Sequence, residues 1–535
     1  MSEGATKKEE KPRKFQAIRG TRDLLPPETA LWNRVEQTTH EVFASYGFGE
    51  IRPPIFEPTE LFVRAVGGET DIVSKEMFIL AEQHEDRDVL ALSHLRDALT
   101  LMAVSADHKP SVDFFLEKSA EFCDGYQAAL KKGVVYADER GGIKIEYVKE
   151  ARQHLVDTIA QDRFEGWRDR FDETVRLCIQ YMGLITLEQG NALRPEATAS
   201  VCRAYIEHNM QQLPQPVKLY YMGPMFRRER PQKGRYRQFY QIGAEILGGP
   251  DAPAIDAELI EMLMTFFAKL ELEGTTLDIN SIGHAADNCR RGYVAKLKAE
   301  LEKVKDKLGA DSQRRIETNP LRVLDSKLEH EQAIIATLPK IADYICDDCK
   351  THYAAVKREL DLRGVKYQEN WRLVRGLDYY MRTTFEITAR GLGSQNAVCG
   401  GGRYDGLVEL LGGPPTKGIG FAIGEDRLIL SLQEAGKGAA PQSRDVYIAW
   451  MGQNAYATAI RAAKTLRAAG FSVELPPTEL KFGKALERAS KLGSRFALIL
   501  GDNEVTSGEW TLKNLANAEQ QKLNEQALLE YLRKA

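Results

Sequence analysis

The chain has 535 residues, of which 43% are hydrophobic and 28% are charged, and its formal net charge at pH 7 is −4. This length is too great for one hydrophobic core, so we expect roughly three or four domains of an ordinary globular protein. The small negative charge excludes binding of nucleic acid through overall charge, so an RNA partner would need local basic patches.

No stretch approaches the ~20 apolar residues that cross a bilayer, so we expect no membrane partner. Residues 1–14 (MSEGATKKEEKPRK) lack the apolar run of a secretory signal and are expected to form a disordered tail. The seven cysteines are an odd number scattered along the chain, which favours reduced thiols and a cytoplasmic location over a disulfide framework.

The first predicted elements are a helix and a strand. Apolar residues recur at helical spacing between Pro27 and Tyr46, and Gly47 ends the pattern. The segment Glu50–Phe56 reads as a strand but contains two prolines, which cannot donate to a ladder. We therefore expect this strand at a sheet edge or at a seam between subunits.

Residues 80–181 have a mostly helical pattern, with apolar residues at three- and four-residue steps. One interpretation is a module that touches RNA, and the other is a helical elaboration packed on the main domain. The second is favoured, because charges of both signs alternate and no basic stripe with aromatic residues emerges.

The most informative stretch is 219–247, where two apolar runs flank a turn with Pro and Gly, as in an antiparallel hairpin with a long loop. The turn carries one acid, Glu229, and six bases: Arg227, Arg228, Arg230, Lys233, Arg235 and Arg237. Gln241 and Glu245 fall at alternate positions of the second run and so on one face. Guanidinium groups donate in parallel pairs to anionic oxygens, so a phosphate clamp is a better interpretation than a solvated loop.

Residues 285–363 are predicted to be helical and rich in Lys and Glu, and they contain Cys346 and Cys349 as a CxxC pair with His352 nearby. This set lacks a fourth ligand at a usual spacing, so reduced cysteines are favoured over a zinc site and the metal assignment stays open. Strands are expected at Thr383–Thr388 and Val398–Gly402.

A run of glycine and apolar residues at 418–424 then leads into a helix bearing Asp426 and Arg427. Residues 433–443 have the composition of a linker. After the linker, five elements alternate, which indicates a small α/β domain: strands at Asp445–Trp450, Phe471–Leu475 and Phe496–Leu500, and helices at Ala455–Ala469 and Phe482–Leu492.

Three segments together resemble one family. The FRRERPQKGRYRQF turn resembles the second signature motif of class II aminoacyl-tRNA synthetases, and with LVRGLDYY (373–380) and GGGRYDGL (400–407) it resembles the histidyl-tRNA synthetases in particular. The segment 27–56 resembles the first motif, 418–427 resembles the third, and IRGTRD (18–23) resembles the leading segment of the family. Where the family usually has Glu, this chain has Asp426. Against the family pattern, about a hundred extra residues lie between motif 1 and Arg194-Pro195-Glu196.

The resemblance implies an α+β catalytic domain, an antiparallel sheet flanked by helices, with helical insertions and a C-terminal α/β anticodon-binding domain. The expected map is a tail (1–14), the catalytic domain in three parts (15–79, 182–284 and 369–432), an extra insertion (80–181), a helical insertion domain (285–368), a linker (433–443) and an anticodon-binding domain (444–535). A homodimer through the motif 1 region is implied as well.

The implied reaction is ATP-dependent ligation of L-histidine to tRNA(His) through a histidyl-adenylate, with Mg²⁺ expected beside ATP. No Walker-type GxxxxGK[ST] loop is present to hold ATP in another way. Neither step needs a protein nucleophile, because the protein must align two anions and absorb charge at phosphorus.

The resemblance implies the site residues in three groups, with no metal ligand assigned. The catalytic residues are Arg227 and Arg375. The histidine-binding residues are Glu196, Ala197, Thr198, Gln241, Glu245, Arg375, Tyr379 and Tyr380. The ATP-binding residues are Arg227, Glu229, Arg235, Phe239 and Arg427. Glu245 and Tyr380 are expected to bracket the imidazole, since a ring with two nitrogens is singled out by partners at both edges.

Two rival interpretations remain. One is a catalytically inactive paralogue that resembles the regulatory subunit of histidine biosynthesis. Such proteins lack the C-terminal domain and lose motif arginines, whereas this chain has the C-terminal domain and the motif arginines. The other is a class II synthetase for another amino acid, which the LVRGLDYY and GGGRYDGL segments disfavour.

Overall fold

The computed structural model describes residues 15–67, 70, 72–80, 112–131, 153, 157, 191–377, 379–389, 396–438 and 444–535. The predicted tail and most of the predicted insertion at 80–181 lie outside the described residues, apart from helix α4 (Val112–Lys131) and two single positions. The chain divides into two compact units, Met1–Arg22 with Thr38–Ser431, and Asp23–Gln37 with Leu432–Ala535.

The first unit is built on an eight-stranded sheet in the order β1-β5-β6-β11-β10-β9-β7-β8. Its strands are β1 (Gly49–Glu50), β5 (Val217–Phe226), β6 (Gln238–Leu247), β7 (Thr276–Ser281), β8 (Gln368–Glu369), β9 (Met381–Thr388), β10 (Ala397–Arg403) and β11 (Gly418–Gly424). The six central strands are antiparallel, and the short outer strands β1 and β8 run parallel to their neighbours.

The predicted hairpin is confirmed. Strands β5 and β6 pair over ten residues, from Val217 opposite Leu247 to Phe226 opposite Gln238, so the basic turn begins at the end of the ladder. Alternating side chains of β6 reach the same face of the sheet, which places Gln241 and Glu245 together as expected.

The predicted strand at 50–56 is wrong as a single strand. The structure has β1 at Gly49–Glu50 and a separate β2 at Phe56–Pro58, which belongs to a small sheet with β3 (Phe78–Ile79) and β4 (Asn191–Leu193). Pro53 and Pro54 lack N–H donors and fall in the gap between the two strands. The expected edge position is confirmed, because β1 lies at one end of the large sheet.

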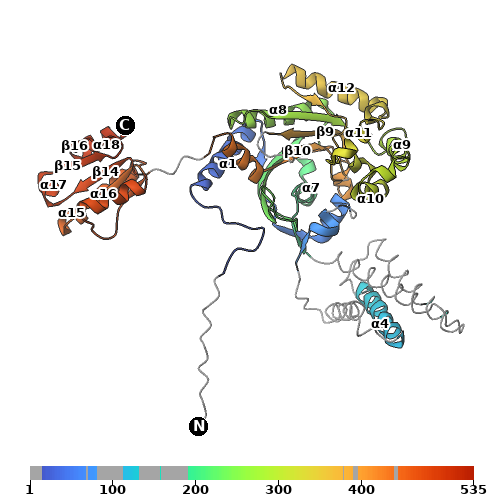
Figure 1. Ribbon diagram of the computed structural model, residues 1–535, viewed down its shortest axis with the longest axis horizontal. Helices are drawn as coiled ribbons and strands as arrows, with labels where there is room; N and C mark the ends of the chain where they lie inside the picture. The colour runs from blue at the N-terminus through green and yellow to red at the C-terminus, as the bar shows by residue number, and fades with distance from the viewer. Residues whose placement is uncertain are drawn as a thin grey trace, which may run out of the picture. The chain divides into compact units, whose positions relative to one another are not determined.

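Helices surround this sheet and also make up most of residues 285–363. The predicted helix at 27–46 is α1 (Glu28–Ser45), and the helices of the catalytic segments are α2 (Thr59–Val66), α7 (Thr198–Glu207), α8 (Pro253–Lys269), α13 (Leu407–Leu410) and α14 (Glu425–Glu434). The predicted helical character of 285–363 is confirmed by α9 (Arg290–Glu302), α10 (Ala310–Thr318), α11 (Glu329–Ile335) and α12 (Asp347–Leu362). Helices α8 and α12 lie side by side (Figure 1).

The C-terminal unit contains a five-stranded sheet in the order β13-β12-β14-β15-β16. Its elements are β12 (Val446–Trp450), α15 (Gln453–Ala468), β13 (Val473–Glu474), α16 (Phe482–Lys491), β14 (Phe496–Leu500), α17 (Asp502–Ser507), β15 (Trp510–Asn514), β16 (Gln520–Leu523) and α18 (Glu525–Lys534). The first three strands are parallel, as the predicted strand–helix alternation requires, and the last two are an antiparallel addition.

The predicted fold class is therefore confirmed, whereas the boundaries of the domains stay predictions. In the part of the chain that the structure describes, no helix is both long and apolar enough to span a membrane.

Candidate active site

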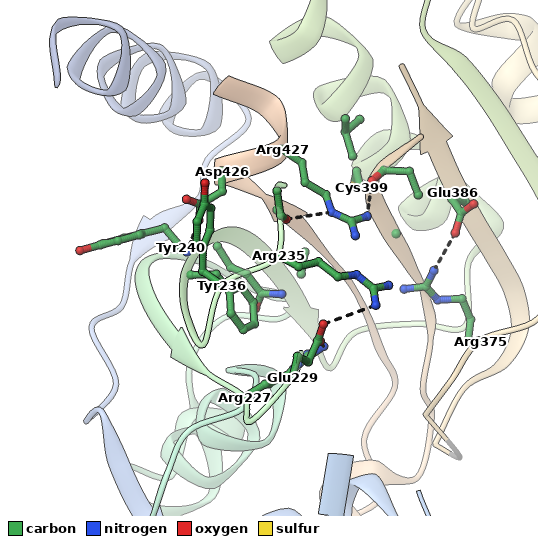
Figure 2. Close-up of a pocket in the computed structure, with 18 residues that line it drawn as sticks. Arg227, Glu229, Arg235, Tyr236, Tyr240, Arg375, Glu386, Cys399, Asp426 and Arg427 are labelled. Carbon is green, nitrogen blue, oxygen red and sulfur yellow. Dashed lines mark hydrogen bonds and ion pairs between the residues drawn. The ribbon is translucent and has the colours of Figure 1, made fainter. Parts of the chain in front are cut away.

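A cavity lies over the middle of the large sheet, where β6, β10 and β11 are neighbours and the loop between β5 and β6 folds above them (Figure 2). Its charged and polar lining includes Arg227, Glu229, Arg235, Gln241, Arg375, Glu386, Asp426 and Arg427, and Phe239 adds an aromatic ring. Four guanidinium groups from three distant segments thus share one cavity. This is the juxtaposition that the three sequence motifs predict.

The hairpin loop is held in a defined shape. The Arg227 N–H donates to the Arg237 carbonyl at 2.9 Å, and Arg227 Nε donates to the Pro195 carbonyl at 2.9 Å. Glu229 lies between two arginines, with Nη1 of Arg227 at 3.7 Å and Nη1 of Arg235 at 3.5 Å. The Arg227 guanidinium also lies over the Phe239 ring, 5.2 Å from its centroid.

The leading segment at residues 18–23 braces this loop. Arg237 donates its N–H to the Gly20 carbonyl at 2.7 Å, and Arg22 pairs with Asp426 at 3.0 Å. The second oxygen of Asp426 accepts the N–H of Tyr240 at 2.8 Å. Burial raises the pKa of Asp426. Asp426 therefore joins β6, α14 and the leading segment beside the cavity.

Arg375 enters the cavity across the glycine-rich strand β10. Its Nη1 lies 3.5 Å from a Glu386 oxygen on β9, and its guanidinium lies over the Tyr380 ring, 5.3 Å from the centroid. A Cβ at Gly400 would lie 2.2 Å from Arg375 Nη1. The absence of a side chain at this position is what lets the guanidinium lie flat against the strand.

Arg427 reaches the cavity from the first turn of α14. It donates to the Ala397 carbonyl at 3.0 Å and to the Gly234 carbonyl at 3.4 Å, which ties β10 to the hairpin loop. Burial and then the nearby charge of Arg235 lower the pKa of Arg427. Gathering these cations costs free energy, which an anionic ligand would recover.

A second, buried group lies further along β6. The Thr198 hydroxyl donates to Glu245 Oε1 at 2.7 Å, and the Tyr404 hydroxyl donates to Oε2. Glu245 is 1% exposed, and burial raises its pKa to about 8. A Cβ at Gly420 would lie 1.6 Å from Glu245 Oε2, so the neighbouring strand leaves the space that this carboxyl occupies.

Aromatic rings line the same region. The Tyr379 ring lies 4.7 Å from Tyr380 and 5.7 Å from Tyr404, centroid to centroid. A Cβ at Gly402 would approach Tyr380 to 3.0 Å, so the rings pack against bare backbone of β10. Gln241 on β6 carries an Oε1 that is buried without a hydrogen-bond partner within the described protein, and its side chain faces the arginine cavity. Such an orphaned acceptor marks a place for a donor from a ligand.

Glu196 and Ala197 lie at the start of α7. Glu196 accepts the N–H groups of Thr198 at 2.7 Å and Ala199 at 3.0 Å, so it caps the helix, and burial raises its pKa. Ala197 is fully buried in the hydrophobic core. Glu196 and Ala197 therefore have a structural role at the start of α7, in addition to any contact with a ligand.

The structure brings in residues that the sequence interpretation did not assign. Tyr404 binds Glu245, Glu386 faces Arg375, and Arg22 holds Asp426. Tyr404 and Arg22 belong to segments whose resemblance is recognisable, which is a signal that could have found them. The sequence offers only one signal for Glu386, its position on a predicted strand, and many glutamates that face solvent share that signal.

Comparison with known proteins agrees with this geometry. A family model described as histidyl-tRNA synthetase matches residues 188–428, and one described as an anticodon binding domain matches residues 445–535. The histidine–tRNA ligase of Koribacter versatilis is 44% identical over 523 residues, covering 97% of this chain and 96% of that protein. That of Solibacter usitatus is 44% identical over 511 residues, covering 95% and 96%.

A solved structure of apo Staphylococcus aureus histidyl-tRNA synthetase is 29% identical, with a TM-score of 0.64, and the match covers 97% of this chain and all of that one. The Nostoc histidyl-tRNA synthetase, at 18% identity and a TM-score of 0.59, shares the fold. With relatives of this identity over nearly its whole length, and with the motif arginines gathered in one cavity, the chain belongs to the histidyl-tRNA synthetase family.

Proposed function

We propose that the chain activates L-histidine with ATP and transfers the histidyl group to tRNA(His). The observation that carries this proposal is the cavity shared by Arg227, Arg235, Arg375 and Arg427, together with the buried group of Glu245 and tyrosines on the same sheet. A nucleoside triphosphate matches the positive charge of the first region, and a small polar amino acid matches the polar groups of the second.

In the first step, a histidine carboxylate oxygen attacks the α-phosphorus of ATP, and the bond from that phosphorus to the bridging oxygen of pyrophosphate breaks. Two anions must approach each other, so the barrier is largely electrostatic. Arg227 and Arg375 hold the α-phosphate, and Arg375 also orients the attacking carboxylate. Arg235 and Arg427 bind the outer phosphates, and Phe239 stacks on adenine.

The ion pairs in the cavity suit this task. Arg235–Glu229 and Arg375–Glu386 are both 3.5 Å apart, longer than the ~2.7–2.9 Å of a tight charge-assisted hydrogen bond. Phosphate oxygens can therefore replace the carboxylates as partners at moderate cost. The glutamates keep the guanidinium groups in place until the ligand arrives, which reduces reorganisation during the reaction.

The histidine side chain binds beside Glu245, over strands β6, β11 and β10. Glu245 and Tyr380 bracket the imidazole, Tyr379 and the Gly400–Gly402 backbone form the wall, and Gln241 contacts the carboxylate end. Thr198 and Glu196 receive the ammonium group. A side chain without two ring nitrogens would leave buried polar groups unpaired, which penalises the wrong amino acid strongly.

Mg²⁺ fits the donor set of the cavity. Glu229 and Glu386 present carboxylate oxygens, the hard ligands that Mg²⁺ takes together with phosphate oxygens and water. Either carboxylate would supply one ligand beside the phosphate oxygens and water, and when bound the ion would neutralise charge on the phosphates. Positioning of the attacking carboxylate rests on the arginines.

In the second step, a terminal ribose hydroxyl of tRNA attacks the adenylate carbonyl, and AMP leaves. The C-terminal unit, residues 444–535, binds the anticodon region, which its match to an anticodon-binding family model supports. A homodimer through the motif 1 region and a cytoplasmic location complete the proposal.

ATP–pyrophosphate exchange with each amino acid tests the proposal. We expect exchange with histidine alone, and Arg375→Ala should reduce it by at least about 10²-fold, as loss of a charge-stabilising donor does. The matched control is Arg363→Ala, at an arginine of the α12 C-terminus that pairs with Glu359 and Glu261 outside the cavity. No exchange with any amino acid would favour the regulatory paralogue, and exchange with another amino acid would identify a different synthetase.

A further inference from the structure

A group of potential metal ligands lies outside the active-site cavity. His284, Cys289, Cys346 and Cys349 each offer one ligand atom, and these four atoms all lie within 4.8 Å of one another. His284 follows strand β7, Cys289 is the residue before α9, and the CxxC pair begins α12. The two pairs are separated by 57 positions from Cys289 to Cys346, so the fold alone brings them together.

His352, the histidine nearest to the CxxC pair in sequence, is not part of this group. Its Nε2 instead faces Asp251 at 3.8 Å and Asp256 at 3.9 Å. The residues that complete the group come from the loop between β7 and α9. The apparent lack of a fourth ligand in the sequence is therefore corrected by the structure.

Three of the six spacings between the ligand atoms are close to the edges of a tetrahedron around one ion. Zinc bonds of ~2.3 Å to sulfur and ~2.1 Å to nitrogen imply edges of about 3.8 Å between sulfurs and about 3.6 Å between sulfur and nitrogen. The Cys289 and Cys349 sulfurs are 3.9 Å apart, and His284 Nδ1 lies 3.2 Å from the Cys349 sulfur and 3.7 Å from that of Cys346. Only tenths of an ångström separate these distances from the ideal edges.

The surroundings suit thiolates. The backbone N–H groups of His284 and Cys346 each donate to the Cys289 sulfur at 3.4 Å, a pattern that stabilises negative charge on sulfur. Two nearby acids, Asp287 and Asp347, have side chains that are 94% and 99% exposed, so their charges point to water rather than to the sulfurs. The cationic side chain of Arg382 also lies beside Cys349, so the charges around the sulfurs favour thiolates.

The backbone around the group is also specialised. Gly283 has a φ of +63°, and a Cβ there would lie 2.6 Å from the Cys289 sulfur. The Gly283 carbonyl accepts the Arg382 N–H at 2.8 Å, which fixes the loop against the start of β9. Glycine at this position lets the chain turn so that His284 and Cys289 face the CxxC pair.

We propose that His284, Cys289, Cys346 and Cys349 bind one Zn²⁺ ion as a closed, structural site. Three thiolates and one imidazole are ligands that zinc prefers, and four protein ligands leave no open position for substrate or water. The ion would join the end of β7 to the first turns of α9 and α12. Arg290, which follows Cys289, donates to the Tyr380 carbonyl, so the same clamp supports the wall of the active site.

Metal content of the full chain, purified without a metal-affinity tag, tests this proposal. We expect about one equivalent of zinc per chain, and at least about tenfold less in Cys349→Ser. The matched control is Cys123→Ser, at a buried cysteine of α4 that is not in the group, and it should keep the full equivalent.

A second measurement covers a variant that fails to fold. Wild-type chain stripped with a chelator and titrated with Co²⁺ should show saturable thiolate-to-cobalt and tetrahedral absorption bands at one equivalent. Three outcomes would overturn the proposal: reduced wild type that binds no stoichiometric metal, unchanged zinc in a folded Cys349→Ser variant, or octahedral cobalt bands. None of these readouts depends on aminoacylation, so failure here is separable from failure of the proposed function.

Discussion

The buried carboxyl of Glu245 should make the free energy of unfolding of the first unit (Met1–Arg22 with Thr38–Ser431) depend on pH. Burial raises the pKa of this group from 4.5 to about 8, so the folded chain holds it protonated at neutral pH. Between these two values the folded state binds one proton more than the unfolded state, and stability falls as the pH rises. The stabilising contribution is complete below pH 4.5 and lost above pH 8. At 1.36 kcal/mol per unit of pKa, the total is about 5 kcal/mol.

Glu245→Gln removes this dependence. The amide is neutral at every pH and has the same shape, and the Thr198 and Tyr404 hydroxyls can turn to serve as its partners. With an unfolding entropy of ~2.1 cal/mol/K per residue and a unit of roughly 400 residues, 5 kcal/mol corresponds to about 6 °C in the unfolding midpoint.

The assay is thermal unfolding of both proteins without ligands, followed by fluorescence between pH 5 and pH 9. Between pH 5 and pH 9 about 4 kcal/mol of this contribution is lost, so we expect the midpoint of the variant to rise relative to that of wild type by about 5 °C across this range. The matched control, Glu409→Gln at an exposed glutamate of α13, reports the loss of a carboxyl at the surface. Parallel midpoint curves for wild type and Glu245→Gln would refute the reasoning, since they would mean that burial does not hold the proton.

Three further changes address the proposed site. Gly400→Ala places a methyl group 2.2 Å from Arg375 Nη1, so exchange should fall at least about 10²-fold while the unfolding midpoint stays near that of wild type; normal exchange would show that Arg375 is not needed in this position. Tyr404→Phe removes a donor to Glu245 and should raise the KM for histidine about tenfold with an unchanged KM for ATP, and equal changes in both would argue for a general loss of structure. Deletion of residues 445–535 should leave exchange intact and abolish tRNA charging, and full charging by the shortened chain would contradict the role of this unit.

The hairpin and its arginines could be predicted because their signals are local. Alternation on both sides of a charged turn defines two paired strands, and the register between β5 and β6 follows from the turn that joins them. The C-terminal alternation of strands and helices is equally local, and its first five elements were predictable. Strands β15 and β16 were not, because Trp510–Asn514 and Gln520–Leu523 are short and partly polar.

Features that depend on distant contacts could not be predicted in the same way. Pro53 and Pro54 indicate a sheet edge. Whether the chain continues as one strand depends on the strands that pair with it, and here its two ends pair in two different sheets. The proposed zinc ligands could not be predicted for the same reason. His284 and Cys289 become neighbours of Cys346 only in the folded chain, where the first residues of α9 and α12 lie close together.

Two glutamates of the site show why a residue type does not determine its chemistry. Glu229 lies between two guanidinium groups at the mouth of a cavity, where it is suited to hold cations in place and to release them to a phosphate. Glu245 lies further along the hairpin, on β6, enclosed by two hydroxyl groups and by the bare backbone of Gly420, where a charge would be costly. The motif places both residues on one hairpin, and the arginines beside Glu229 belong to that hairpin as well. The groups that enclose Glu245 (Thr198, Tyr404 and Gly420) come from other parts of the chain. A synthetase that must bind a triphosphate and recognise an imidazole a few ångströms away needs this contrast, and a sheet that gathers distant segments provides it.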